Sequence, residues 1–150
     1  VDRMTTRKLV VWRPKDGLEG PLHYVEVKFA DGLQLVFEDE SNTEIKIIYN
    51  QNINSKFVLA FRFTDDLKRG DLSKIAREAR IEYFNTINAK PWYFYKMINS
   101  DFIHWFDQLP GPGSNEISNI QHFIFMCSEE TFEVISEYEP IVQINKKKSV

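Results

Sequence analysis

Hydrophobic and polar positions alternate with a period of two through most of the first 63 residues, which predicts β-strands. Residues 8–13 are rich in β-branched side chains, residues 23–29 and 33–37 carry apolar side chains at odd positions, and residues 44–49 alternate again. Residues 56–63 are apolar on both faces, which favours a central strand. We therefore predict an antiparallel meander with short connections.

The turn between the second and third of these strands can be assigned from side-chain parity. A two-residue loop at Asp31-Gly32 would put the apolar odd positions of the two strands on opposite faces. A three-residue loop that begins at Ala30 pairs Phe29 with Leu33 and keeps those positions on one face. We predict the three-residue loop, with Gly32 in the left-handed region forming a bulge.

The hydrophobic period changes at Asp71, where apolar side chains begin to recur with helical spacing. This pattern predicts a helix that is capped by Asp71 and ends near Asn85. A shorter helix, capped by Ser100 or Asp101, should precede the Pro/Gly-rich residues 110–115. Further strands are predicted at residues 92–98, 120–127, 131–136 and 141–144.

The predicted elements give an α+β fold, with residues 1–150 forming a single domain. We expect an antiparallel sheet of about six to eight strands, which can be curved, with one longer and one shorter helix packed on it. Residues 1–7 and 145–150 are expected to be poorly ordered. The aromatic residues (3 Trp, 6 Tyr and 12 Phe) are densest between Trp92 and Phe106, and we predict that those rings fill the core.

The sequence contains no motif of catalytic or cofactor chemistry. Glycine-rich phosphate loops, Gly-x-Ser-x-Gly, His-Glu-x-x-His, Cys-x-x-Cys and the EF-hand pattern are all absent. His23, His104 and His122 are not at metal-ligand spacing. We therefore expect no cofactor, no metal site and no enzymatic activity. His122 and Glu133 make the best acid–base pair, but without an evident nucleophile we favour a hydrogen-bonded histidine at the edge of the core.

Charge and hydropathy narrow the class of partner. A net charge of −3 argues against a nucleic-acid binder, and no stretch approaches the roughly 20 apolar residues of a membrane span.

The single cysteine, Cys127, can form no intramolecular disulfide and is predicted to be a buried thiol. The first residues lack the apolar core of a signal peptide, so we expect a cytoplasmic protein.

Acidic side chains gather in two parts of the sequence, and both groups are nearly free of basic neighbours. The simpler interpretation is a solvated face. The functional interpretation is an anionic surface that attracts a basic protein and speeds association. The predicted contact residues are Glu38, Asp39, Glu40, Glu44, Glu129, Glu130, Glu133 and Glu137.

Several short motifs between residues 92 and 140 resemble small uncharacterised bacterial proteins related to the immunity partners of polymorphic and contact-dependent growth inhibition toxins. These motifs are Asn99-Ser100-Asp101-Phe102, Trp105-Phe106, His122-Phe123-Ile124, Phe132-Glu133-Val134-Ile135-Ser136 and Glu139-Pro140. The resemblance covers about a third of the chain. It implies a non-enzymatic protein that binds a toxin domain, and it transfers no individual binding residue.

Three functional hypotheses follow from the sequence. The first is a cytoplasmic immunity-type protein that binds and neutralises a bacterial toxin domain, which we expect to be basic. The second is a small-molecule-binding module whose aromatic-lined pocket is built from Trp92 to Trp105. The third is an enzyme that uses His122 and Glu133. We favour the first, because the acidic groups and the absence of catalytic motifs agree with the resemblance.

Overall fold

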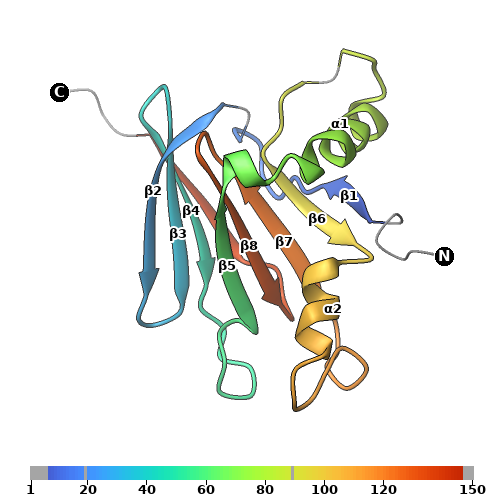
Figure 1. Ribbon diagram of the computed structural model, residues 1–150. Coiled ribbons are helices and arrows are strands. Elements are labelled where there is room, and N and C mark those ends of the chain that lie inside the picture. Colours follow the sequence, from blue (N-terminus) through green and yellow to red (C-terminus); the bar gives the residue numbers. More distant parts are fainter. Residues whose placement is uncertain (1–6, 19, 89, 147–150) are drawn as a thin grey trace.

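The computed structural model describes residues 7–18, 20–88 and 90–146, and within them the chain forms nine strands and two α-helices (Figure 1). The strands are β1 (Lys8–Val11), β2 (Leu22–Phe29), β3 (Leu33–Asp39), β4 (Thr43–Tyr49), β5 (Ala60–Asp65), β6 (Phe94–Ile98), β7 (Gln121–Met126), β8 (Glu130–Ser136) and β9 (Ile141–Lys146). The helices are α1 (Asp71–Phe84) and α2 (Asp101–Asp107), with a 3-10 turn, η2, at Asp66–Lys68. The predicted α+β class, with one longer and one shorter helix, is confirmed.

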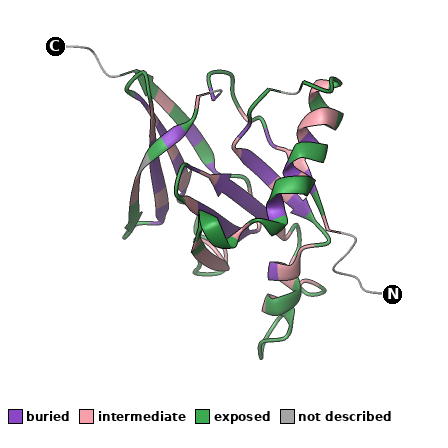
Figure 2. Ribbon diagram, turned by 45° about the horizontal axis from the view of Figure 1, so that its top comes forward, coloured by how far each residue is buried: buried purple, intermediate pink, exposed green. Residues whose placement is uncertain are grey.

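The strands form two antiparallel sheets, where the sequence pattern had suggested one. The first sheet has the order β1-β6-β7-β8-β5 and the second the order β2-β3-β4-β9. They pack face to face, since the ring of Phe37 on β3 lies about 6 Å from the rings of Phe94, Phe125 and Phe132 in the other sheet. Aromatic rings fill the roughly 10 Å between packed sheets, so the ring-rich strands become the core. Figure 2 shows the buried residues concentrated along these strands.

The β2–β3 hairpin has the predicted three-residue loop. Phe29 pairs with Leu33 and Val27 with Leu35, so the apolar odd positions share one face. Gly32 has a φ of +122°, and a Cβ atom there would lie 2.4 Å from the carbonyl oxygen of Tyr49. The positive φ and the close backbone approach both require glycine at this position.

The prediction of a central strand at residues 56–63 is wrong. The strand that forms, β5, covers Ala60–Asp65 and lies at the edge of its sheet, paired only with β8. Its apolar character reflects Phe61 and Phe63, whose rings stack on Phe132 of β8 at 6.2 and 5.9 Å. Phe63 nevertheless remains 63% exposed. The inner strands of this sheet are β6, β7 and β8, which supply most of the aromatic core.

The two helices lie on the five-stranded sheet, away from the second sheet (Figure 1). Gly70 occupies the N-cap of α1 and Asp71 is the first helical residue, so the prediction of Asp71 as the cap is wrong by one position. The helix ends at Phe84, close to the predicted end, and its C-cap Asn85 adopts a left-handed conformation. Ser100 caps α2 as predicted, because its hydroxyl accepts a hydrogen bond from the Ile103 amide.

The expected disorder at the ends of the chain can be tested at only a few positions, since residues 1–6 and 147–150 lie outside the described residues. Arg7 forms an ion pair with Asp71 at 3.1 Å. Asn145 and Lys146 belong to β9 and pair with β4, so the expectation is wrong for these two residues. Within the described ranges, neither helix combines the length and apolar character that a membrane crossing requires.

Candidate functional site

Glu133 of β8 lies inside the protein, on the face of the five-stranded sheet that α2 covers. Its side chain is 0% exposed. Arg62 of β5 donates to it twice, from Nε to Oε2 at 2.7 Å and from Nη2 to Oε1 at 3.1 Å, and Arg69 donates from Nη1 to Oε2 at 2.5 Å. The prediction of Glu133 as a partner contact is therefore wrong, because a carboxylate without exposed surface cannot touch another protein.

The ionisation of Glu133 reflects a balance between burial and hydrogen bonding. Burial raises the pKa, because it disfavours the charged form, but hydrogen bonds from His122 and Arg62 outweigh it and lower the pKa from 4.5 to about 2. Arg69 extends the cluster to Asp71 at the start of α1, with Nε 3.1 Å from Oδ1. The result is a network of ionised side chains, buried at Glu133 and Arg69 and partly exposed at Arg62 and Asp71, that ties β5, β8 and α1 together.

His122 of β7 connects this network to α2 and to Ser100. Its Nε2 lies 2.9 Å from Oε1 of Glu133, and its Nδ1 lies 2.7 Å from the hydroxyl oxygen of Ser100. The imidazole is 1% exposed, so the two contacts define its orientation. The predicted His122–Glu133 pair is confirmed as a contact. The hydroxyl partner, Ser100, was not predicted, although the N-cap pattern places this residue at the start of α2.

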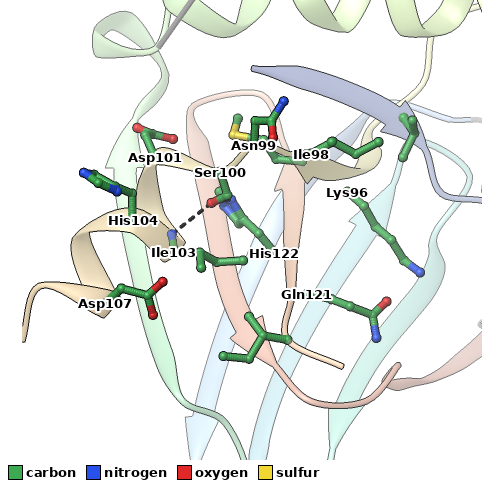
Figure 3. A pocket seen from close by; sticks show the side chains of 13 residues that line it. Lys96, Ile98, Asn99, Ser100, Asp101, Ile103, His104, Asp107, Gln121 and His122 are labelled. Carbon is green, nitrogen blue, oxygen red and sulfur yellow. Dashed lines mark hydrogen bonds between the residues drawn. The ribbon is translucent and has the colours of Figure 1, made fainter. Parts of the chain in front are cut away.

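A cavity of about 1060 Å³ lies beside Ser100 and His122, between α2 and the ends of β6 and β7 (Figure 3). Its wall contains four aliphatic side chains from different elements, Val10, Ile98, Ile103 and Ile120. None of Trp92, Tyr93, Phe94 or Trp105 lines it. This cavity is therefore not the aromatic-lined pocket of the second hypothesis, since its wall is aliphatic and polar.

The aromatic residues that were candidates for such a pocket are mostly in the core. Trp92, Phe94 and Tyr95 are buried. The indole Nε1 of Trp92 donates to the carbonyl oxygen of Phe94 at 2.8 Å, so its polar atom is also satisfied inside. Trp105 is the exception at 47% exposed, and its ring stacks on Phe102 at 5.5 Å. The predicted role of this segment as core filling holds for its strand residues.

A group of carboxylates, four of them exposed and two (Asp39 and Glu130) half-buried, lies at the opposite end of the sheets from α2. The β3–β4 turn, the β7–β8 turn and η2 meet there, at the top of Figure 1. The β7–β8 turn lies beside the β3–β4 turn, because the Ser128 amide donates to the Leu22 carbonyl at 2.8 Å and Leu22 pairs with Asp39. The β7–β8 turn also contacts η2, since the Asp66 amide donates to the Glu129 carbonyl at 2.9 Å. We call this surface the acidic edge and define it as Asp39, Glu40, Asp65, Asp66, Glu129 and Glu130.

The acidic edge carries charge that the described part of the chain does not neutralise. No ion pair between its six carboxylates and a described basic residue is present. Some of them have local hydrogen bonds, since Asp39 accepts from the amides of Ser41 and Thr43, and Asp65 accepts from that of Leu67. These contacts order the turns without adding positive charge. Asp65 and Asp66 were not among the residues predicted from the sequence.

The other predicted acidic contacts lie in different surroundings. Glu38 faces Glu44 across β3 and β4, and Glu44 lies 3.6 Å from Lys46. Glu137 follows the far end of β8, roughly 20 Å from Glu130 at the strand spacing of 3.3 Å per residue. The second acidic group of the sequence is therefore divided among three places: the acidic edge, the interior and the opposite end of the sheet.

Cys127 shows no sign of a reactive thiol. It is buried, as predicted, and its Sγ lies 3.2 Å from Oε2 of Glu130. Burial and this hydrogen bond raise its pKa from 9 to about 12, so the nucleophilic thiolate is disfavoured.

His104 is exposed, as predicted, and lies at the rim of the cavity. Among the described residues no group of three or more His, Cys, Asp and Glu side chains is arranged to hold a metal ion.

Comparisons with known proteins identify no relative. No protein-family model, no curated protein and no solved structure matches the chain. Function must therefore be inferred from the residues themselves, and above all from two features. One is the exposed acidic edge, and the other is the buried network that leads from Arg69 to Ser100.

Proposed function

We propose that this chain is an immunity-type protein, which binds a basic toxin domain of bacterial origin and neutralises it by covering its functional surface. The observation that carries the proposal is the acidic edge, where six carboxylates from three separate segments lie together and form no ion pair with any basic residue that the structure describes. Such a surface raises the association rate with a basic partner and selects against acidic ones. The immunity protein would act in the cytoplasm, where the toxin domain would reach its target.

An apolar patch within the acidic edge supports a protein partner over a small cation. Phe63 and Leu67 are 63% and 92% exposed, and they flank Asp65 and Asp66 in one short segment. Protein interfaces combine exposed apolar anchors with a polar or charged rim. Leu67 follows directly after two carboxylates, so a basic partner that pairs with them would also bury this side chain.

The proposal is tested by growth protection in a bacterial host. The host would co-express this chain with the toxin domain encoded next to its gene, and we expect growth to be restored. The triple charge reversal Glu40→Lys, Asp66→Lys and Glu129→Lys should abolish protection and slow association at least about tenfold at low salt. Purified proteins in a surface-binding assay would give the association rates.

A matched control reverses the same number of charges elsewhere. Asp31 and Glu116 are exposed, and Glu137 is half-exposed; all three lie outside the acidic edge. The variant Asp31→Lys, Glu116→Lys, Glu137→Lys has the same net charge as the first, and it should protect as well as the parent chain. The proposal fails if the adjacent gene encodes no toxic domain, or if a folded acidic-edge variant protects as well as the control.

A further inference from the structure

The three side chains Ser100, His122 and Glu133 form one continuous hydrogen-bonded chain that ends at a cavity. We propose that this chain of side chains is a second, separate site, an acyl-ester hydrolase centre with Ser100 as nucleophile and His122 as general base. Glu133 is a positioning residue, since its hydrogen-bond partners among the described residues are His122, Arg62 and Arg69. This activity is independent of toxin binding, because the acidic edge lies at the opposite end of the sheets.

The hydrogen bonds of His122 favour the tautomer that a general base requires. The carboxylate of Glu133 can only accept, so the proton of the neutral ring lies on Nε2, 2.9 Å from Oε1. Nδ1 then presents its lone pair to the Ser100 hydroxyl at 2.7 Å. Arg62 and Arg69 hold the carboxylate in place from its other side. The geometry meets the distance criterion for a base that removes a proton from a nucleophile.

The position of Ser100 makes its hydroxyl accessible. It follows Asn99, whose φ of +55° produces a sharp turn between β6 and α2. Ser100 retains partial exposure while His122 is buried, and both line the cavity of about 1060 Å³. In Figure 3 the two side chains point toward each other, and Ile103 lies beside them. A substrate can therefore approach Ser100 from the cavity, with the imidazole directly behind the hydroxyl.

The cavity wall indicates the class of substrate. Val10, Ile98, Ile103 and Ile120 offer an aliphatic surface to a short acyl or alkyl chain. Lys96, the cationic side chain in the wall, is already paired with Glu139 at 2.6 Å. A neutral ester of a short-chain carboxylic acid fits these features better than an anionic substrate does.

The reaction balances with water as the second substrate. The oxygen of Ser100 forms a bond to the ester carbonyl carbon as its proton passes to Nδ1 of His122. The carbon–oxygen bond to the alcohol then breaks, and the departing alkoxide takes the proton from His122. Water attacks the acyl group on Ser100, again giving a proton to His122, which returns it to the Ser100 oxygen as the carboxylic acid leaves.

The proposal is tested on the full chain with an alkyl fluorophosphonate, which phosphonylates nucleophilic serines and releases fluoride. We expect one adduct per chain by intact mass, located at Ser100 by peptide mapping, together with hydrolysis of p-nitrophenyl butyrate. Absence of an adduct at Ser100, in protein shown to be folded by circular dichroism, would overturn the proposal. So would an adduct confined to another serine.

Variants separate a nucleophile from a helix cap. Ser100→Asn removes the hydroxyl but preserves capping, since asparagine is as good an N-cap as serine. This variant should have the same melting temperature as the parent, and it should lose both the adduct and the esterase activity. His122→Gln should slow labelling about 10²- to 10⁴-fold. Ser73→Ala removes an exposed serine of α1 and should change neither rate. Full activity in a folded Ser100→Asn variant would show that Ser100 serves only as the cap.

Discussion

Glu130 and Glu133 are three residues apart in β8 and have the same side chain, yet they belong to regions with opposite physical roles. Glu133 has no exposed surface and receives donors from Arg62, Arg69 and His122. Glu130 belongs to the acidic edge; it is half-buried and accepts a hydrogen bond from the Cys127 thiol, but no described basic side chain pairs with it. Burying a charge costs several kcal/mol unless partners compensate it, whereas a solvated charge needs none and stays available to another molecule. Net charge and charge runs alone cannot distinguish these two cases.

The largest expected effect comes from breaking the buried network. Glu133→Gln should lower the free energy of unfolding by about 3–5 kcal/mol, because it removes the carboxylate that Arg62 and Arg69 share and leaves Arg69, whose side chain is 8% exposed, with Asp71 as its remaining anionic partner. Glu40→Gln in the acidic edge should change it by less than about 0.5 kcal/mol. Urea denaturation of both variants gives the comparison. If both variants lost the same small amount of unfolding free energy, the side chains of the network would not be desolvated.

The pH dependence of stability should separate the two regions next. Folding lowers the pKa of Glu133 from 4.5 to about 2, so its stabilisation is complete above pH 4.5 and is lost as the pH falls toward 2. The difference corresponds to about 3 kcal/mol. Unfolding free energies at pH 6, 4 and 2.5 measure it, and this acid-sensitive part should be missing from Glu133→Gln. A parent chain equally stable at pH 6 and 2.5 would contradict the assignment.

A buried hydroxyl without a partner provides the next test. The hydroxyl of Tyr49 is buried and has no hydrogen-bond partner among the described residues. Tyr49→Phe should raise the free energy of unfolding by about 1 kcal/mol, because it removes an unpaired polar atom. The matched control is Tyr95→Phe, which removes a hydroxyl that donates to the Trp92 carbonyl at 2.9 Å and should cost about 1 kcal/mol. Thermal unfolding of both variants should show shifts of opposite sign.

Neutralising the acidic edge should have the smallest effect on stability. The double variant Asp66→Asn, Glu129→Gln should unfold within about 0.5 kcal/mol of the parent, with a slight gain if the like charges repel. Its binding to a basic partner should nevertheless weaken. A loss of several kcal/mol in chemical denaturation would show that these carboxylates serve the fold rather than recognition.

Local features of the fold could be predicted from the sequence because local rules determine them. The loop at Gly32 followed from side-chain parity, and the cap at Ser100 from its place before an apolar helical stripe. The division into two sheets did not follow, because alternation predicts strands without naming their neighbours. Arg62 and Arg69 reach Glu133 across 71 and 64 residues, so nothing near Glu133 in the sequence indicated its partners. The edge position of β5 was missed for the same reason.

The pairing of β9 with β4 has a consequence for biosynthesis. Ile45 lies opposite Ile144, so the second sheet remains incomplete until the ribosome has released residues 141–146. Before that moment the nascent chain exposes the free edge of β4 and the apolar face beside it. Contacts between segments so far apart in the sequence also slow folding. We expect cotranslational protection by a chaperone to raise the yield of soluble protein, and removal of residues 141–150 to cause aggregation.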